Sequence, residues 1–213
     1  MRSQKISTRG TLFTAPCGGW DNHLYLIQGK KHNFVIDTGL GAGSVEPVKE
    51  RIHSGGKETI VVNTHYHWDH VWGNGSFQGC IIISHPLCRE MISSEWERMM
   101  GKNGQYRHGE AVMRLPTLVF QQELSFPEER IKIFHTPGHT PDSISVLDEE
   151  DGVLVLADNI GDTLEELVPS LACDRQVYRQ TLEQYRQMNF EVCISGHNRP
   201  LGKEVIQKIL DIL

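Results

Sequence analysis

The sequence lacks the features that mark several classes of protein. It has no apolar run close to the roughly 20 residues that cross a bilayer, and its start, "MRSQKISTRGTLF", has no apolar stretch of signal-peptide length. Positive charge is also scarce, because 21 Lys and Arg face 27 Asp and Glu and the formal net charge is −6. Nucleic acids and anionic membranes bind through basic surfaces. We therefore expect a cytoplasmic protein without a nucleic-acid or membrane partner.

Cysteine is sparse and unpaired. The chain has five cysteines, an odd number, and none lies in a CxxC pair. Such spacing is typical of reduced thiols in a cytosolic protein and not of a disulfide framework. We interpret them mainly as packing residues: Cys17, Cys80, Cys88, Cys173 and Cys193.

The first part of the chain predicts strands around one helix. The runs "HLYLIQG" and "NFVIDTG" flank the turn-forming "GKKHN" and indicate a hairpin. A helix is predicted over 43–56, with Ser44 as its N-cap and Gly55-Gly56 as its stop. The β-branched run "TIVVNTH" then predicts a buried strand.

The segment 86–115 follows the strand predicted in "CIIISHP" and is the least legible. We expect it to be helical at least over 87–100. Its Met and aromatic side chains fit either a core or a flexible lid over a pocket, and both alternatives stay open. These side chains are Met91, Trp96, Met99, Met100 and Tyr106.

The second half repeats this rhythm. Strands are predicted in "RIKIFHTPGHT", "SISVLDEEDGVLVLADNIGD" and "FEVCISGH", with a helix in "DRQVYRQTLEQYRQM" and another in "GKEVIQKILDIL". Tyr178, Leu182 and Tyr185 share one face of the first helix. The pattern predicts one α/β domain over 1–213, a four-layer αββα sandwich of two mixed β-sheets flanked by helices.

The stretch "NTHYHWDHVWGN" concentrates side chains that bind metals. In an extended loop His65 and His67 point the same way, whereas Asp69 and His70 are offset toward a second point. Imidazole and carboxylate are ligands of divalent ions such as Zn²⁺. One segment thus offers parts of two metal shells. We expect Trp68 and Trp72 either to brace this loop or to line a pocket, and favour the first.

Three further candidates each follow an apolar strand: His139 in "TPGHTPDS", Asp158 in "LVLADNIGD" and His197 in "CISGHNRP". A fold that gathers strand ends at one edge would bring them together. The other histidines are interpreted as surface or hydrogen-bonded core residues. They are His23, His32, His53, His85, His108 and His135.

Taken together, these residues resemble the metallo-β-lactamase superfamily of hydrolases, over essentially the whole chain. The HxHxDH motif is matched by positions 65–70, and the later His, Asp and His by His139, Asp158 and His197. The family's β-lactamases commonly have cysteine where Asp158 stands, so the chain looks more like the glyoxalase II branch than a true β-lactamase. Many relatives have glycine before that aspartate, where this chain has Ala157.

The resemblance implies a role for each matched residue. His65, His67 and His139 look like ligands of a first metal, Asp69, His70 and His197 like ligands of a second, and Asp158 like the bridging carboxylate. Asp37 in "VIDTG" matches the aspartate that orients a ligand histidine. Arg199, Lys102 or Arg107 could bind an anionic group of the substrate.

The implied function is hydrolysis of a small ester, thioester, lactone or phosphodiester. Two divalent ions, zinc first and manganese or iron as alternatives, would hold a bridging hydroxide as nucleophile, with Asp69 helping to move a proton. Iron redox chemistry, either a mononuclear sulfur dioxygenase or a di-iron protein of the same fold, is the alternative. A non-enzymatic protein on a retired catalytic scaffold is a third interpretation.

Overall fold

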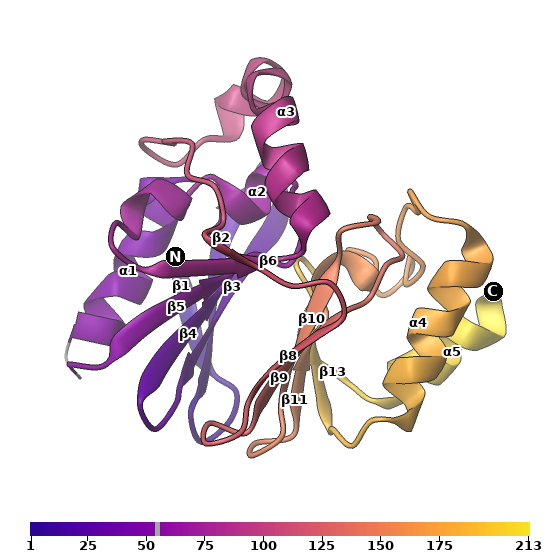
Figure 1. The fold of residues 1–213 in the computed structure, drawn as a ribbon. Helices are drawn as coiled ribbons and strands as arrows, with labels where there is room; N and C mark the ends of the chain where they lie inside the picture. The colour runs from indigo at the N-terminus through magenta and orange to yellow at the C-terminus, as the bar shows by residue number, and fades with distance from the viewer. Residues whose placement is uncertain (54–55) are drawn as a thin grey trace. The chain divides into compact units, whose positions relative to one another are not determined.

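The computed structural model describes residues 1–53 and 56–213, without the side chain of His53. The chain divides into two compact units, Met1–Phe120 and Gln121–Leu213 (Figure 1). Each unit contains one mixed β-sheet with helices packed on it. The predicted stop at Gly55 lies outside the described residues.

The sheet of the first unit has seven strands in the order of the sequence, β1 to β7. Strands β1 to β4 are antiparallel neighbours, whereas β4, β5, β6 and β7 run parallel. The strands are β1 (Arg2–Lys5), β2 (Gly10–Cys17), β3 (Trp20–Gln28), β4 (His32–Ile36), β5 (Glu58–Val62), β6 (Ile81–Ser84) and β7 (Leu118–Val119). The predicted hairpin is confirmed as β3 and β4, while β1, β2 and β7 were not predicted.

Helix α1 (Ala42–His53) covers a face of this sheet, where Val45 and Val48 pack with the buried strand residues Leu26 and Val61. The helix begins before Ser44, so the predicted cap is displaced. The hydroxyl of Ser44 accepts a hydrogen bond from the Leu40 backbone N–H at 3.2 Å, inside the first turn. The side chain of Ser44 therefore stabilises the turn that precedes α1 and does not act as the N-cap of the helix.

The segment after β6 forms α3 (Pro86–Asn103) and the short 3₁₀ helix η2 (Gly104–Tyr106). The predicted helix over 87–100 is confirmed. Trp96 and Met99 are buried against Trp72 beside the short helix α2 (Trp68–Val71), whereas Tyr106 is 36% exposed. This packing supports the core alternative for Trp96 and Met99. Whether 86–115 opens as a lid stays a prediction.

The second unit has a six-stranded sheet in the order β13-β12-β11-β10-β9-β8. Only β11 and β12 are parallel neighbours among its described strands. The strands are β8 (Glu123–Phe126), β9 (Ile131–His135), β10 (Ile144–Asp148), β11 (Val153–Val155), β12 (Val192–Ile194) and β13 (Leu201–Gly202). Strands β9 to β12 were predicted, and β8 and β13 were not.

Helices α4 (Arg175–Gln187) and α5 (Glu204–Ile212) lie side by side on this sheet (Figure 1). Asp174 caps α4 by accepting a hydrogen bond from the Gln176 N–H at 2.7 Å. Tyr178, Leu182 and Tyr185 are fully buried in the same apolar cluster as Leu154 and Cys193, as their spacing predicts, and α5 adds Ile206 and Ile209.

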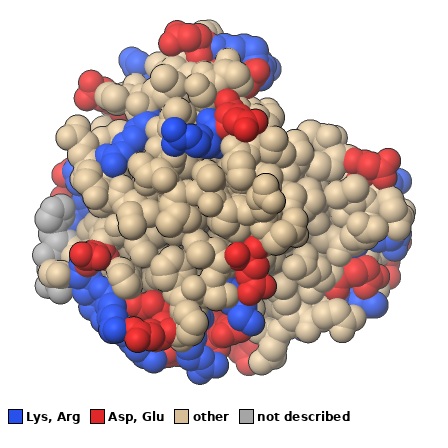
Figure 2. Space-filling view, in the orientation of Figure 1, with Lys and Arg blue, Asp and Glu red and all other residues tan. Residues whose placement is uncertain are grey.

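The fold class is confirmed: the protein is α/β, with two mixed sheets flanked by helices. Within the described residues no helix is both long enough and apolar enough to traverse a bilayer. On the face that Figure 2 draws, basic and acidic side chains are interspersed among uncharged ones.

Candidate metal centre

The first unit places four candidate ligands in the loop after β5. Strand β5 lies between β4 and β6 and is parallel to both, so it is a central strand of the sheet. His65, Asp69 and His70 are buried there, and His67 is half-buried. The ring centroids of His65 and His70 are 4.1 Å apart. The sequence motif is therefore one compact cluster in space.

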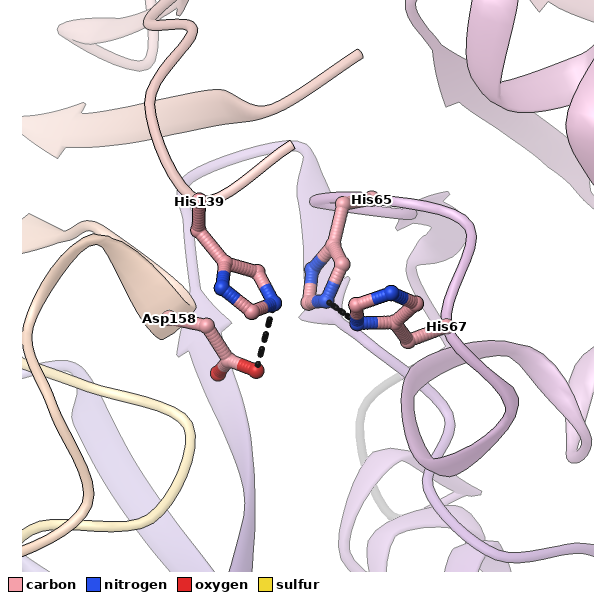
Figure 3. Close-up of side chains that lie close together, drawn as sticks. All are labelled: His65, His67, His139 and Asp158. Carbon is pink, nitrogen blue, oxygen red and sulfur yellow. Dashed lines mark hydrogen bonds and ion pairs between the residues drawn. The ribbon is translucent and has the colours of Figure 1, made fainter. Parts of the chain in front are cut away.

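Within this cluster the donor atoms form two pairs. His65 Nε2 lies 3.0 Å from His67 Nδ1 (Figure 3), and His70 Nε2 lies 3.7 Å from Asp69 Oδ2. These are the two pairs expected from the alternation of side chains, and their role as parts of two metal shells stays a prediction. Asp69 projects from the first turn of α2, which turns the chain between the two pairs.

Asp37, at the carboxyl end of β4, is hydrogen-bonded to the loop that carries the first unit's candidate ligands. Its carboxylate accepts hydrogen bonds from Nδ1 of His70 at 2.7 Å, from the Thr64 N–H at 2.8 Å and from the Thr64 hydroxyl at 2.7 Å. Because Nδ1 of His70 donates, Nε2 is the ring nitrogen that can bind a metal. The family resemblance implies that Asp37 orients a ligand histidine, and this role stays a prediction.

Asparagines at the two ends of "NTHYHWDHVWGN" fix the loop, a role the sequence did not suggest. Asn63 donates to Asn74 Oδ1 at 2.9 Å, and Asn74 donates back to Asn63 Oδ1 at 2.8 Å. The Thr38 hydroxyl lies within hydrogen-bonding distance of Asn74 Oδ1, at 2.9 Å, and of the His70 carbonyl, at 3.1 Å. All three side chains are buried. The asparagine at each end of the motif is the sequence feature from which this contact could have been predicted.

The second unit gathers its three candidates at one sheet edge. Strand β9 is antiparallel to β10 and β10 to β11, while β12 is parallel to β11. The carboxyl ends of β9, β11 and β12 therefore share an edge. His139 follows β9, Asp158 lies in the short 3₁₀ helix η3 (Ala157–Asn159) after β11, and His197 follows β12.

Asp158 lies between the two histidines. Its Oδ2 is 3.6 Å from His139 Nε2 (Figure 3) and 3.4 Å from His197 Nε2. The Ser170 carbonyl accepts a hydrogen bond from His139 Nδ1 at 2.8 Å, so Nε2 of His139 is left to face the carboxylate. Ser170 was not predicted, because a backbone acceptor carries no residue signal.

Asn159, next to Asp158, ties η3 to the core of the second unit. It donates to the Thr136 carbonyl at 2.7 Å and to the Tyr185 hydroxyl at 2.9 Å, and it accepts from the His139 N–H at 3.0 Å. Gly138 leaves room for this arrangement, because a Cβ there would lie 2.5 Å from the Tyr178 ring. The tyrosine face of α4 thus supports both the His139 loop and η3.

The donor separations fit divalent ions. Two ligand atoms that are each 2.0–2.2 Å from a tetrahedral ion lie about 3.3–3.6 Å apart. The His–Asp separations of 3.4, 3.6 and 3.7 Å fall in or next to this range, and the 3.0 Å between His65 and His67 is slightly shorter. Within each unit, His and Asp donor atoms therefore lie at separations that suit metal binding.

Among the described residues the five cysteines form no disulfide, and they suit packing better than catalysis. Burial raises the pKa of Cys17 to about 11, with a further rise from the charge of Asp69, and burial raises the pKa of Cys193 to about 12. Both thiols are protonated at neutral pH, whereas nucleophilic cysteines need lowered pKa values.

The remaining predicted residues lie around these clusters. Trp72 is fully buried, and its ring centroid lies 4.9 Å from that of half-buried Trp68. Trp72 therefore braces the loop. Lys102 and Arg107 are exposed in the first unit, and Arg199 is exposed in the second. Their roles toward a substrate stay predictions.

Comparison with known proteins decides the family. The sequence profile of the metallo-beta-lactamase superfamily matches residues 17–197. The chain belongs to this superfamily. The DIM-1 metallo-beta-lactamase shares its fold with a TM-score of 0.78 at 17% identity, over 99% of this chain and 95% of that one. The structure of TMB-1 matches with a TM-score of 0.76 at 18% identity, over 99% of this chain and 95% of that one.

Sequence relatives are named as hydrolases. A probable metallo-hydrolase of Methanocaldococcus jannaschii is 26% identical over 68% of this chain and 59% of its own length. A hydroxyacylglutathione hydrolase of a Synechococcus strain is 28% identical, over 85% and 71%. An acyl-coenzyme A thioesterase of Gallus gallus is 24% identical, over 88% and 76%. The chain thus spans roughly three-fifths to three-quarters of these relatives' lengths.

Proposed function

We propose that this superfamily member is a dinuclear metal-dependent hydrolase that cleaves a small thioester. His65, His67 and His139 would hold one divalent ion, Asp69, His70 and His197 would hold the other, and Asp158 would be shared by both. Zinc is the expected metal, with manganese or iron as alternatives. Among ester, thioester, lactone and phosphodiester bonds, the thioester is favoured by the relative named a thioesterase.

The observation that carries the proposal is the position of Asp158 Oδ2, 3.4 Å from one histidine and 3.6 Å from another. A carboxylate between two imidazoles suits one ligand shared by two ions. The first unit supplies the complementary pairs, His65 with His67 and Asp69 with His70. Each pair lacks one histidine of a three-ligand shell, and the second unit carries two.

Two bound divalent ions would supply a water nucleophile of lowered pKa and polarise the acyl carbonyl. Water adds to the acyl carbon, the C–S bond breaks, and a carboxylic acid and a thiol leave. Asp69 would accept a proton near the attacking water. Asp37 and the Ser170 carbonyl would keep Nε2 of His70 and of His139 directed at the ions by binding the opposite ring nitrogens.

Metal content and turnover test the proposal together. Protein purified without added metal should hold two zinc or manganese ions per chain, and a coloured protein with one iron would favour the sulfur dioxygenase alternative. In a panel of one thioester, one ester, one lactone and one phosphodiester, wild type should cleave the thioester fastest. D158A should lose this activity, while D162A, at an exposed position of the same loop, should keep it. Equal rates for wild type and D158A would refute the assignment.

A further inference from the structure

A cavity of about 160 Å³ opens beside His67 within the first unit. Tyr66 and Trp68, which flank His67 in the sequence, form one part of the wall. The opposite part comes from the last turns of α3, which contribute Arg98, Met99, Lys102 and Asn103. The cavity therefore borders a candidate metal ligand, while most of its other polar lining comes from one helix.

The charge of this lining has one sign. Arg98 and Lys102 are four residues apart on α3, so their side chains emerge from the same face of the helix. Among the described residues that line the cavity, none is Asp or Glu. Asn103 and Tyr66 add uncharged hydrogen-bonding groups, and Met99 is buried beneath them. The cavity is therefore suited to an anion.

Glu95 is the acidic neighbour of this site and offsets part of its positive charge. Its carboxylate pairs with Nε of Arg98 one turn away on α3. A planar guanidinium bound at Nε keeps its terminal nitrogens for a second acceptor. Lys102 adds another charge, and the side chain of Arg98 is 63% exposed, so both can reach a ligand that enters from solvent.

We propose that this cavity binds a terminal anionic group of the substrate, a carboxylate or a phosphate, and so selects anionic thioesters. Its volume of about 160 Å³ leaves room for one such group. Because His67 lies in the wall, an anion held by Arg98 and Lys102 places the rest of the substrate next to the metal ligands. The reacting bond rests on the proposed function, whereas the anion site does not.

A pair of thioesters with the same acyl group tests the selection, one of a neutral thiol and one of a thiol that ends in a carboxylate. A third compound ends in a phosphate. R98Q/K102Q should raise KM for the charged compounds about tenfold relative to the neutral one, a loss of about 1.4 kcal/mol. The matched control R186Q/K208Q alters an Arg that has the same i,i+3 ion pair, with Glu183 on α4, and should behave as wild type. The charged compound with the larger change identifies the preferred group.

E95Q gives a result of the opposite sign. Removing the carboxylate that competes for Arg98 should lower KM for the charged thioesters a few-fold, which loss of a merely structural contact would not do. An unchanged ratio of charged to neutral KM in both R98Q/K102Q and E95Q would overturn the proposal.

Direct binding separates this proposal from the hydrolase assignment. Acetate and inorganic phosphate are titrated into the metal-loaded protein, and binding is followed by calorimetry and by tryptophan fluorescence, to which Trp68 in the cavity wall contributes. At least one of them should bind about tenfold more weakly to R98Q/K102Q than to R186Q/K208Q. Equal affinities overturn the anion site even if thioesters are cleaved. A weaker affinity supports the site even if wild type cleaves no thioester, in which case only the proposed function fails.

Discussion

The carboxylate of Asp37 accepts a hydrogen bond from Nδ1 of His70 across 2.7 Å, between two side chains that are almost completely inaccessible to water. The same carboxylate holds the backbone and hydroxyl of Thr64, the residue before His65. One buried acid thereby sets the positions of two candidate ligands on opposite sides of the loop. Asp37 itself has a φ of 61°, a left-handed conformation that Asp and Asn tolerate better than other non-glycine residues.

D37N therefore changes the hydrogen bonding and keeps the backbone. The amide is uncharged and matches the donor His70 less well, so the ring loses the partner that fixes its orientation. We expect metal affinity to fall about 10- to 100-fold, measured by competition with a chromophoric chelator. D211N, at an exposed position on α5, is the control. Retention of wild-type affinity by D37N would show that Asp37 only supports the turn.

Ala157, directly before Asp158, has a φ of 46°. A left-handed conformation costs a non-glycine residue about 1–2 kcal/mol, while glycine adds about 0.5–1 kcal/mol of backbone entropy to the unfolded chain. A157G should therefore raise the free energy of unfolding slightly, by about 1 kcal/mol or less, in urea titrations. A157V should lower it, since a β-branched side chain fits this conformation poorly. Destabilisation by A157G would contradict the strain argument.

The local pattern predicted most of what surrounds the candidate ligands. Strands β5, β9, β11 and β12 are short apolar runs, and each is followed by the candidate ligand or ligands that the sequence places after it. The supporting contacts were harder to predict. The Ser170 carbonyl is a backbone group, and the Asn159 side chain accepts from the backbone N–H of His139, so only the folded chain brings these partners together. Strands β7 and β13 are two residues long, too short to show an alternation of apolar and polar residues. The sequence could not decide whether 86–115 is core or lid, because the answer depends on which of its side chains pack against α2.

W96A tests that last alternative. Trp96 is 7% exposed in the cluster that joins α3 to Trp72, so its truncation should lower the free energy of unfolding by about 3–5 kcal/mol. V112A, at a position that is 50% exposed, should change it by no more than about 0.5 kcal/mol. Urea titrations of both variants and wild type make the comparison. If W96A leaves stability unchanged but alters substrate preference, the segment behaves as a loosely attached lid.

Alkaline pH should destabilise the second unit through its buried acids. Burial raises the pKa of Cys193 from 9.0 to about 12 and the pKa of Tyr185 from 10.0 to about 12, although the hydrogen bond with Ser145 opposes the latter. Below about pH 8 both groups are protonated in the folded and unfolded states, so neither affects the pH dependence. Above pH 9 the unfolded chain releases the Cys193 proton first, and stability must fall as pH rises toward 12.

Cys193→Ala isolates this contribution between pH 9 and 10, before tyrosine ionises extensively in the unfolded chain. The wild-type free energy of unfolding should fall in that interval by about 1 kcal/mol more than that of C193A, measured in urea with a reductant present. Some decline remains in the variant, because the pKa of Cys17 is also raised, to about 11. The comparison uses only the change with pH, so the packing lost at position 193 cancels. Equal declines in the two proteins would mean that the Cys193 thiol ionises in the folded protein as readily as in the unfolded chain.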